Sequence, residues 1–74
     1  MKVRLLREDR TDAIEELPEV AVRHVCEHFG YPWRFNGETP YLTTSNLVVR
    51  AKELGETELY EKLVALRVKW AMLA

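Results

Sequence analysis

Apolar and polar residues alternate at the start of the chain. Val3 and Leu5 would face one side of an extended segment, and Lys2 and Arg4 would face the other. A period of two is typical of a strand with one buried side. The pattern therefore predicts a first strand over residues 2–7.

The period then changes to that of a helix. Apolar residues recur at spacings of three and four, which places them on one helix face: Ile14, Leu17, Ala21, Val25 and Phe29. Asp12 followed by Glu15 has the spacing of a capping box at a helix start. Because Pro18 fits only a first helical turn, we expect a short opening turn over 12–17 and the main helix over 18–29.

Asn36-Gly37 stands between two aromatic segments, which is a strong local signal for a two-residue hairpin turn. We expect this hairpin to span residues 33–42, with Trp33 and Phe35 pointing to the same side. Pro40 has no N–H to donate, so its strand should lie at an edge of the sheet.

Two helices complete the expected fold. Thr43-Thr44-Ser45 supplies N-cap candidates for a helix over 44–54, and Gly55 would end it. A last helix should then cover residues 57–73. The order is β-α-β-β-α-α, which predicts a single α+β domain over 1–74. Its three-stranded, antiparallel-type sheet would carry the helices, and the last two would form a C-terminal helical hairpin.

Composition fits one small folded domain. The 74 residues are 47% hydrophobic and 31% charged, with a formal net charge of −1. A single cysteine excludes an internal disulfide and fits a reducing compartment, so we expect a cytoplasmic protein. The N-terminus lacks a signal-peptide pattern, and no apolar run approaches the roughly 20 residues of a membrane-spanning helix.

His24-Val25-Cys26-Glu27-His28 has the H-x-x-E-H spacing of the inverted zincin metalloproteases, which would place two imidazoles on adjacent helical turns. Those enzymes take a further acidic ligand from a later helix of a much larger domain. Both histidines flank the apolar face of the helix, so we predict that they lie in solvent. Zinc binding through His24 and His28 is a third hypothesis for function.

No catalytic group stands out. Cys26 has no neighbour that would activate a nucleophile, and we expect an inert, partly buried thiol. The three glycines stand apart, so there is no glycine-rich phosphate loop. We therefore predict a protein without catalytic, metal-ligating or cofactor-binding residues.

Ala51, Leu54 and Gly55 have the spacing of a DNA-binding helix-turn-helix. The helix that would read DNA begins with Glu56 and Glu58, however, and carboxylates repel phosphates. A nucleic-acid-binding regulator stays as the alternative function. It would use a basic face, with Tyr41 stacking on the nucleobases. The basic residues of this face would be Arg4, Arg7, Arg34 and Arg50.

The last helix is apolar on more than one side. One seam has a four-three spacing, namely Leu59, Leu63, Leu66, Trp70 and Leu73. Further apolar residues lie beside it, namely Tyr60, Val64, Val68, Ala71 and Met72. Either the helix over 44–54 folds back to cover the second flank, or a partner covers it.

These patterns favour a non-catalytic protein-interaction module, a small regulator or inhibitor that binds a larger protein. A homodimer through residues 57–73 is one form of this interaction. The expected partner-binding residues are Trp70, Leu66, Leu63, Met72, Tyr41 and Arg34. We expect no membrane association.

Overall fold

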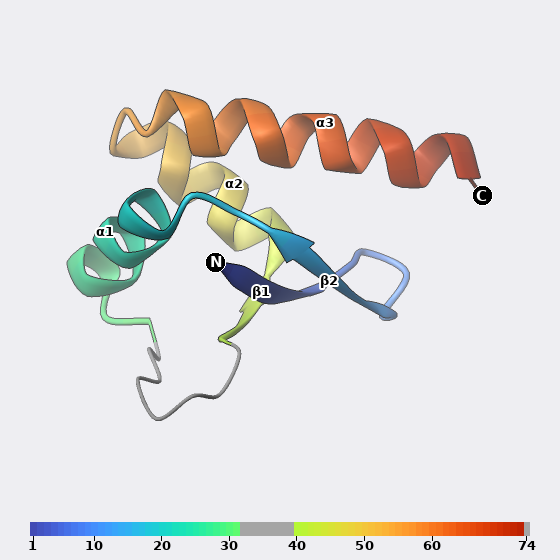
Figure 1. Ribbon diagram of the computed structural model, residues 1–74, viewed down its shortest axis with the longest axis horizontal. Coiled ribbons are helices and arrows are strands. Elements are labelled where there is room, and N and C mark those ends of the chain that lie inside the picture. The colour runs from blue at the N-terminus through green and yellow to red at the C-terminus, as the bar shows by residue number, and fades with distance from the viewer. Residues whose placement is uncertain (32–39, 74) are drawn as a thin grey trace.

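The computed structural model describes residues 1–31 and 40–73 (Figure 1). Three strands and three helices follow one another in this part of the chain: β1 (Lys2–Leu6), β2 (Asp12–Glu16), α1 (Glu19–Phe29), β3 (Tyr41–Thr43), α2 (Thr44–Glu53) and α3 (Thr57–Leu73). The sheet has the order β2-β1-β3. The predicted α+β class with three strands is confirmed, but the order of elements is β-β-α-β-α-α.

Residues 12–16 form a strand, so the helical opening turn predicted there is wrong. β2 pairs antiparallel with β1, with Arg4 opposite Ile14. The connecting loop is closed by the Arg7 N–H, which donates to the Thr11 carbonyl at 2.8 Å. A residue before proline is biased toward an extended conformation, which favours a strand leading up to Pro18. Pro18 itself is extended and is the N-cap of α1, so the main helix starts where it was predicted.

β3 lies at the other edge of the sheet, as the proline before it predicted. It pairs parallel with β1, and Arg4 lies opposite Tyr41. The sheet is therefore mixed, and the expectation of an antiparallel-type sheet is wrong for this pair. A parallel neighbour requires a crossover connection, and α1 lies within it. The predicted Asn36-Gly37 hairpin turn lies outside the described residues.

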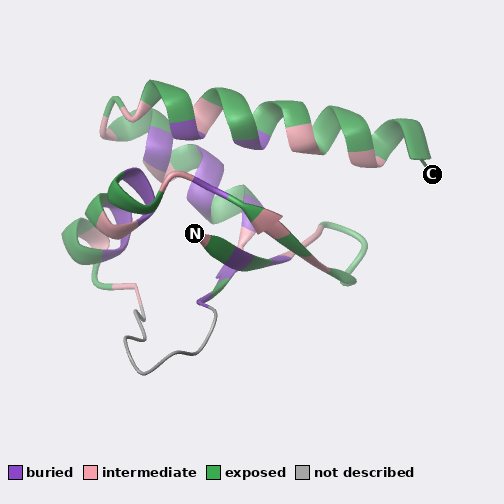
Figure 2. Cartoon of the chain, viewed as in Figure 1, coloured by how far each residue is buried: buried purple, intermediate pink, exposed green. Residues whose placement is uncertain are grey.

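The helices bury one side of the sheet. Figure 2 shows the buried positions where α1, α2 and the first half of α3 face β1 and one another. The core contains thirteen residues: Val3, Leu5, Leu17, Ala21, Val22, Val25, Cys26, Leu42, Leu47, Val48, Ala51, Leu59 and Leu63. The Thr44 hydroxyl donates to the Leu6 carbonyl at 2.9 Å, which ties the start of α2 to β1.

α3 is longer than the body beneath it. Its first turns pack against α2, where Leu59 and Leu63 are fully buried. Its later turns extend past α2 and over the loop between β1 and β2 (Figure 1). The helical pair is confirmed, but α2 covers only the beginning of the apolar seam of α3.

The two ends of this seam should respond differently to truncation. Leu63 is 0% exposed and Leu73 is 74% exposed, although both are leucines of the same helix. We expect Leu63→Ala to lower the free energy of unfolding by about 2–5 kcal/mol, because it leaves a cavity in the core. Leu73→Ala should change it by no more than about 0.5 kcal/mol. Urea unfolding followed by circular dichroism measures both, and equal losses would contradict this packing.

Candidate protein-interaction surface

The second half of α3 exposes large apolar side chains. Val64 is 37% exposed, Val68 54%, Met72 80% and Leu73 74%. We call these four residues the α3 patch. Val64, Val68 and Met72 are four residues apart and therefore lie along one side of the helix, and Leu73 adds an exposed side chain at its end. Exposed apolar side chains grouped in this way are typical of an interaction site.

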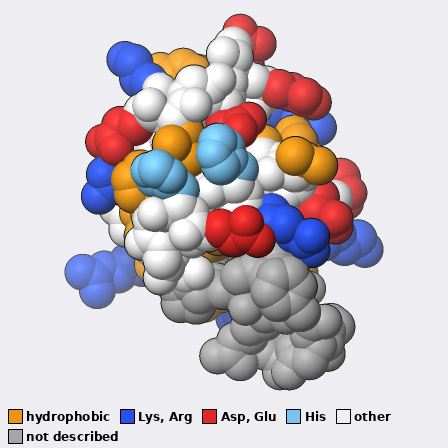
Figure 3. Space-filling view, turned by 90° about the vertical axis from the view of Figure 1, so that its left-hand side faces the viewer, with side chains coloured by type: hydrophobic (Ala, Val, Ile, Leu, Met, Phe, Trp, Pro, Cys, Tyr) orange, Lys and Arg blue, Asp and Glu red, His pale blue; other side chains and the backbone are white. Residues whose placement is uncertain are grey.

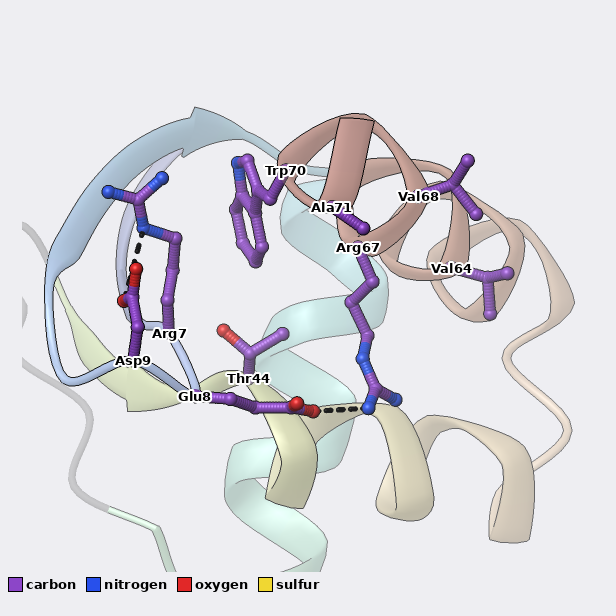
Figure 4. Close-up of a pocket in the computed structure, with 9 residues that line it drawn as sticks. All are labelled: Arg7, Glu8, Asp9, Thr44, Val64, Arg67, Val68, Trp70 and Ala71. Atoms are coloured by element: carbon purple, nitrogen blue, oxygen red, sulfur yellow. Dashed lines mark hydrogen bonds and ion pairs between the residues drawn. The ribbon is translucent and has the colours of Figure 1, made fainter. Parts of the chain in front are cut away.

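A hollow of about 520 Å³ lies beside the α3 patch (Figure 4). α3 forms one wall, and the loop after β1 together with the start of α2 forms the other. The residues that line it are Arg7, Glu8, Asp9, Thr44, Val64, Arg67, Val68, Trp70 and Ala71. The ring of Trp70 projects from α3 toward Arg7 (Figure 4). Apolar side chains of α3 and charged side chains of the loop therefore share one concave surface.

The charges around this hollow are paired with one another. Arg67 of α3 forms an ion pair with Glu8 of the loop. Arg7 lies 5.6 Å from the centroid of the Trp70 ring and 4.0 Å from the Asp9 carboxylate. These contacts hold the overhanging half of α3 against the loop. They also leave the rim of the hollow close to neutral, which suits an apolar partner surface better than a polyanion.

The loop is ordered by its own hydrogen bonds. The Thr11 N–H and hydroxyl both donate to Asp9 Oδ1, at 3.0 and 2.6 Å. Chiefly through the hydroxyl, these bonds lower the pKa of Asp9, because they stabilise its ionised form. Arg7 donates from Nε to the Thr11 hydroxyl at 2.8 Å. The hollow thus has one preformed wall, which reduces the ordering that a partner must impose.

Four of the predicted partner-binding residues lie on α3, and three of them are at least partly exposed. Trp70 lines the hollow, Met72 is exposed, and Leu66 is half-buried against the core. Leu63 requires a correction, because it is fully buried where α3 packs on α2. Its place in the apolar seam predicted a contact, but the contact is with the core of the same chain.

The other two predicted residues do not join this surface in the described structure. Tyr41 lies in β3, where its hydroxyl donates to Asp12 at 2.9 Å and the Arg4 guanidinium lies 4.8 Å from its ring centroid. The bond to Asp12 raises the pKa of Tyr41. Arg34 lies outside the described residues.

Several residues of the hollow were not predicted from the sequence. Glu8, Asp9 and Arg67 were not singled out in the sequence, and Arg7 was predicted only as part of the first strand and of a basic face. Glu8 and Arg67 are separated by 59 positions. No local pattern joins positions so distant, so their contact follows only from the fold.

A basic face for nucleic acid does not form from the three arginines that the structure describes. Arg4 pairs with Asp12, Arg7 lies near Asp9, and Arg50 pairs with Glu53. Acidic and basic side chains are also interspersed on the face drawn in Figure 3. Since phosphate binding relies on concentrated positive charge, these pairings weigh against the nucleic-acid alternative.

The histidines are exposed, as predicted, and their ring centroids lie 6.3 Å apart (Figure 3). Nδ1 of His24 lies 2.5 Å from Oε1 of Glu56 at the turn before α3. Within residues 1–31 and 40–73, no group of three or more His, Cys, Asp or Glu side chains could hold a metal ion. The zinc hypothesis thus has two histidines but no third ligand in this part of the chain.

Cys26 belongs to the core, where it is 1% exposed. Burial raises the pKa of its thiol to about 11, and the charge of Glu27 acts in the same direction. A thiol with so high a pKa is hardly ionised at neutral pH, whereas a nucleophile must be a thiolate. The residue therefore has a packing role.

Comparison with protein families, curated proteins and solved structures finds no match to this chain. None of the helices α1 to α3, which all lie in the described part of the chain, is long and apolar enough to cross a membrane.

The buried thiol leads to a test of the core. We expect alkylation of Cys26 by iodoacetamide at pH 7 to be slow in the folded protein and fast in denaturant. The raised pKa also implies that the free energy of unfolding falls between pH 9 and about 11, where only the unfolded thiol ionises. Cys26→Ala should remove this part of the pH dependence, measured by urea unfolding at each pH. Rapid alkylation without denaturant would contradict the buried position.

Proposed function

We propose that this chain is a non-catalytic protein-interaction module, a small regulator that binds another protein through the α3 patch and the adjoining hollow. The observation that carries the proposal is the exposure of four large apolar side chains on the overhanging half of α3. Their burial against a partner would be favourable by roughly 25 cal/mol for each Å² removed from water.

The shape of this surface supports a protein partner. Trp70 stands in the hollow with its ring partly accessible, and tryptophan is among the residues that contribute most to protein interfaces. The α3 patch lies on the same helix, with Val64 and Val68 also lining the hollow. Paired charges at the rim resemble the polar border of a protein interface, where ion pairs fix orientation more than affinity.

The side chains that could in principle take part in catalysis support a non-catalytic role. The thiol of Cys26 is buried, and His24 is engaged with Glu56. The carboxylate of Asp12 accepts bonds from Arg4 and Tyr41, which lower its pKa and keep it ionised. An ionised, paired carboxylate is a poor general acid or base near neutral pH.

A matched pair of valines tests the proposal. Val68 is 54% exposed on α3 and Val49 is 53% exposed on α2. A photo-crosslinking amino acid in place of Met72 would first capture and identify the bound protein, which is then purified. We expect Val68→Glu to weaken the binding of this captured protein at least tenfold. A carboxylate buried in the interface without a partner would reduce the binding free energy by more than about 1.4 kcal/mol. Isothermal titration calorimetry measures the dissociation constants.

Val49→Glu is the control, since it adds the same charge to an equally exposed valine outside the α3 patch. It should leave the dissociation constant unchanged, and circular dichroism should show both variants folded. Equal weakening by both substitutions, or crosslinks that form from position 49 and not from 72, would show that binding occurs elsewhere.

A further inference from the structure

The two histidines of the chain lie on successive turns of α1. His24 and His28 are four positions apart, a spacing that places both side chains on one side of a helix. Both are exposed, and their ring centroids lie 6.3 Å apart. Two imidazoles thus stand next to each other at the surface (Figure 3), on a different part of the molecule from the second half of α3 (Figure 1).

Glu56 holds one of these rings in a defined orientation. It lies in the turn between α2 and α3, and its Oε1 is 2.5 Å from Nδ1 of His24. The carboxylate is the more buried of the two, with 27% of its side chain exposed against 50% for His24. Because an ionised carboxylate only accepts hydrogen bonds, the N–H of a neutral His24 ring is at Nδ1. Nε2 then carries the free lone pair, which is what a metal ion binds.

Histidines that bind metals have the same second contact. They donate their other ring N–H to a carboxylate, a backbone carbonyl or water, which fixes the ring and makes the free nitrogen a better ligand. Glu56 has this position toward His24, from 32 residues along the chain. The spacing of the histidines in the sequence does not predict it. The fold therefore adds to the histidine pair the carboxylate that a metal site would need.

We propose that α1 carries a binding site for one divalent transition-metal ion, held by Nε2 of His24 and a ring nitrogen of His28, with Glu56 as the positioning residue for His24. Imidazole nitrogen is a preferred ligand of ions such as Zn²⁺, Cu²⁺ and Ni²⁺. Within residues 1–31 and 40–73, no third His, Cys, Asp or Glu completes a group that could hold an ion. Water therefore fills the remaining coordination positions.

The geometry needs only a small adjustment. Zn²⁺ binds imidazole nitrogens at about 2.0–2.1 Å, so two ligand nitrogens of a tetrahedral site lie about 3.4 Å apart. Facing nitrogens of two rings whose centroids are 6.3 Å apart approach this separation when the rings turn about their side-chain bonds. Both imidazoles are exposed, so this rotation moves no core side chain. Cys26, which lies between them in the sequence, is 1% exposed and its sulfur is not available to the ion.

The ion would connect two turns of α1 and, through Glu56, the turn before α3. An ion that binds only the folded chain also stabilises it by mass action. With two protein ligands, the site is weaker than a structural zinc site, which has four. Cu²⁺ should bind more tightly than Zn²⁺, in the usual order for sites with nitrogen ligands.

Isothermal titration calorimetry of the 74-residue chain with ZnCl₂ tests this site. We expect one ion per chain. His24→Ala and His28→Ala should each weaken binding by roughly tenfold or more, because the second bond to the same ion is intramolecular. If each histidine instead bound its own ion, either substitution would halve the number of ions and leave the dissociation constant unchanged, which would overturn the shared site.

Glu56→Ala tests the positioning role. It should weaken Zn²⁺ binding by about tenfold and keep one ion per chain, since loss of such a carboxylate typically has an effect of this size. Glu56→Gln keeps an oxygen that can accept from Nδ1 and should recover part of the loss. Glu58→Ala is the matched control, because it removes an exposed carboxylate from the first turn of α3. It should leave the dissociation constant unchanged.

Nuclear magnetic resonance identifies the ligands directly. The ring C–H signals of His24 and His28 should shift together as Zn²⁺ is added, with one dependence on its concentration. Absence of stoichiometric binding, or binding that survives replacement of both histidines, would overturn the site. Equal effects of Glu56→Ala and Glu58→Ala would overturn the role of Glu56. Circular dichroism should show each variant folded. The site shares no residue with the α3 patch or the hollow, so either outcome leaves the proposed function as it stands.

Discussion

Burial of Leu59 and Leu63 fixes the first turns of α3 to the core. The exposed apolar surface of α3 lies beyond the turns that are packed in this way. Each buried leucine contributes about 1.5–3 kcal/mol, and both lie in the first turns of a 17-residue helix. Beyond them Leu66 and Trp70 are only partly buried against the core, and the helix is also held by the Arg67–Glu8 ion pair and by Arg7 against Trp70. Exposed contacts of these kinds contribute about 1 kcal/mol or less each. The chain thus keeps the later turns of the helix in place while Val64, Val68 and Met72 stay exposed.

Much of the fold could be predicted from the sequence, because β1, α1, α2 and α3 have regular apolar periods with clear ends. Gly30 takes a positive φ of 69° and its N–H bonds to the Cys26 carbonyl, as a residue that ends a helix does. The helical turn predicted over residues 12–17 is wrong for a specific reason. Asp12 with Glu15 has the spacing of a helix start, but all five residues of β2 pair with β1. The bias of Leu17 before proline was the signal that favoured a strand.

The candidate interaction surface was predictable only in part. The apolar excess of residues 57–73 is a local pattern, and it correctly placed Trp70 and Met72 on or beside an exposed surface. Which leucines of the seam would be covered depends on where α2 crosses α3, and this is a property of the fold. The approach of Glu8 to Arg67 likewise depends on the β1–β2 pairing, which carries the loop beneath the later turns of α3. Periodicity describes one element at a time and cannot predict contacts between elements.

The open face of the sheet shows why a partner is expected at α3 and not there. One residue of each strand joins a polar cluster: Arg4 donates to Asp12 at 3.0 and 2.7 Å, and Tyr41 donates to the same carboxylate at 2.9 Å. These groups satisfy one another while exposed to water, so this face is stable uncovered. Ile14 lies on this same face, opposite Arg4, and Val20 lies on α1; each is exposed singly, and isolated apolar side chains are ordinary on protein surfaces. Only along α3 do exposed apolar residues follow one another over successive turns in the described structure, and there the gain from a partner is greatest.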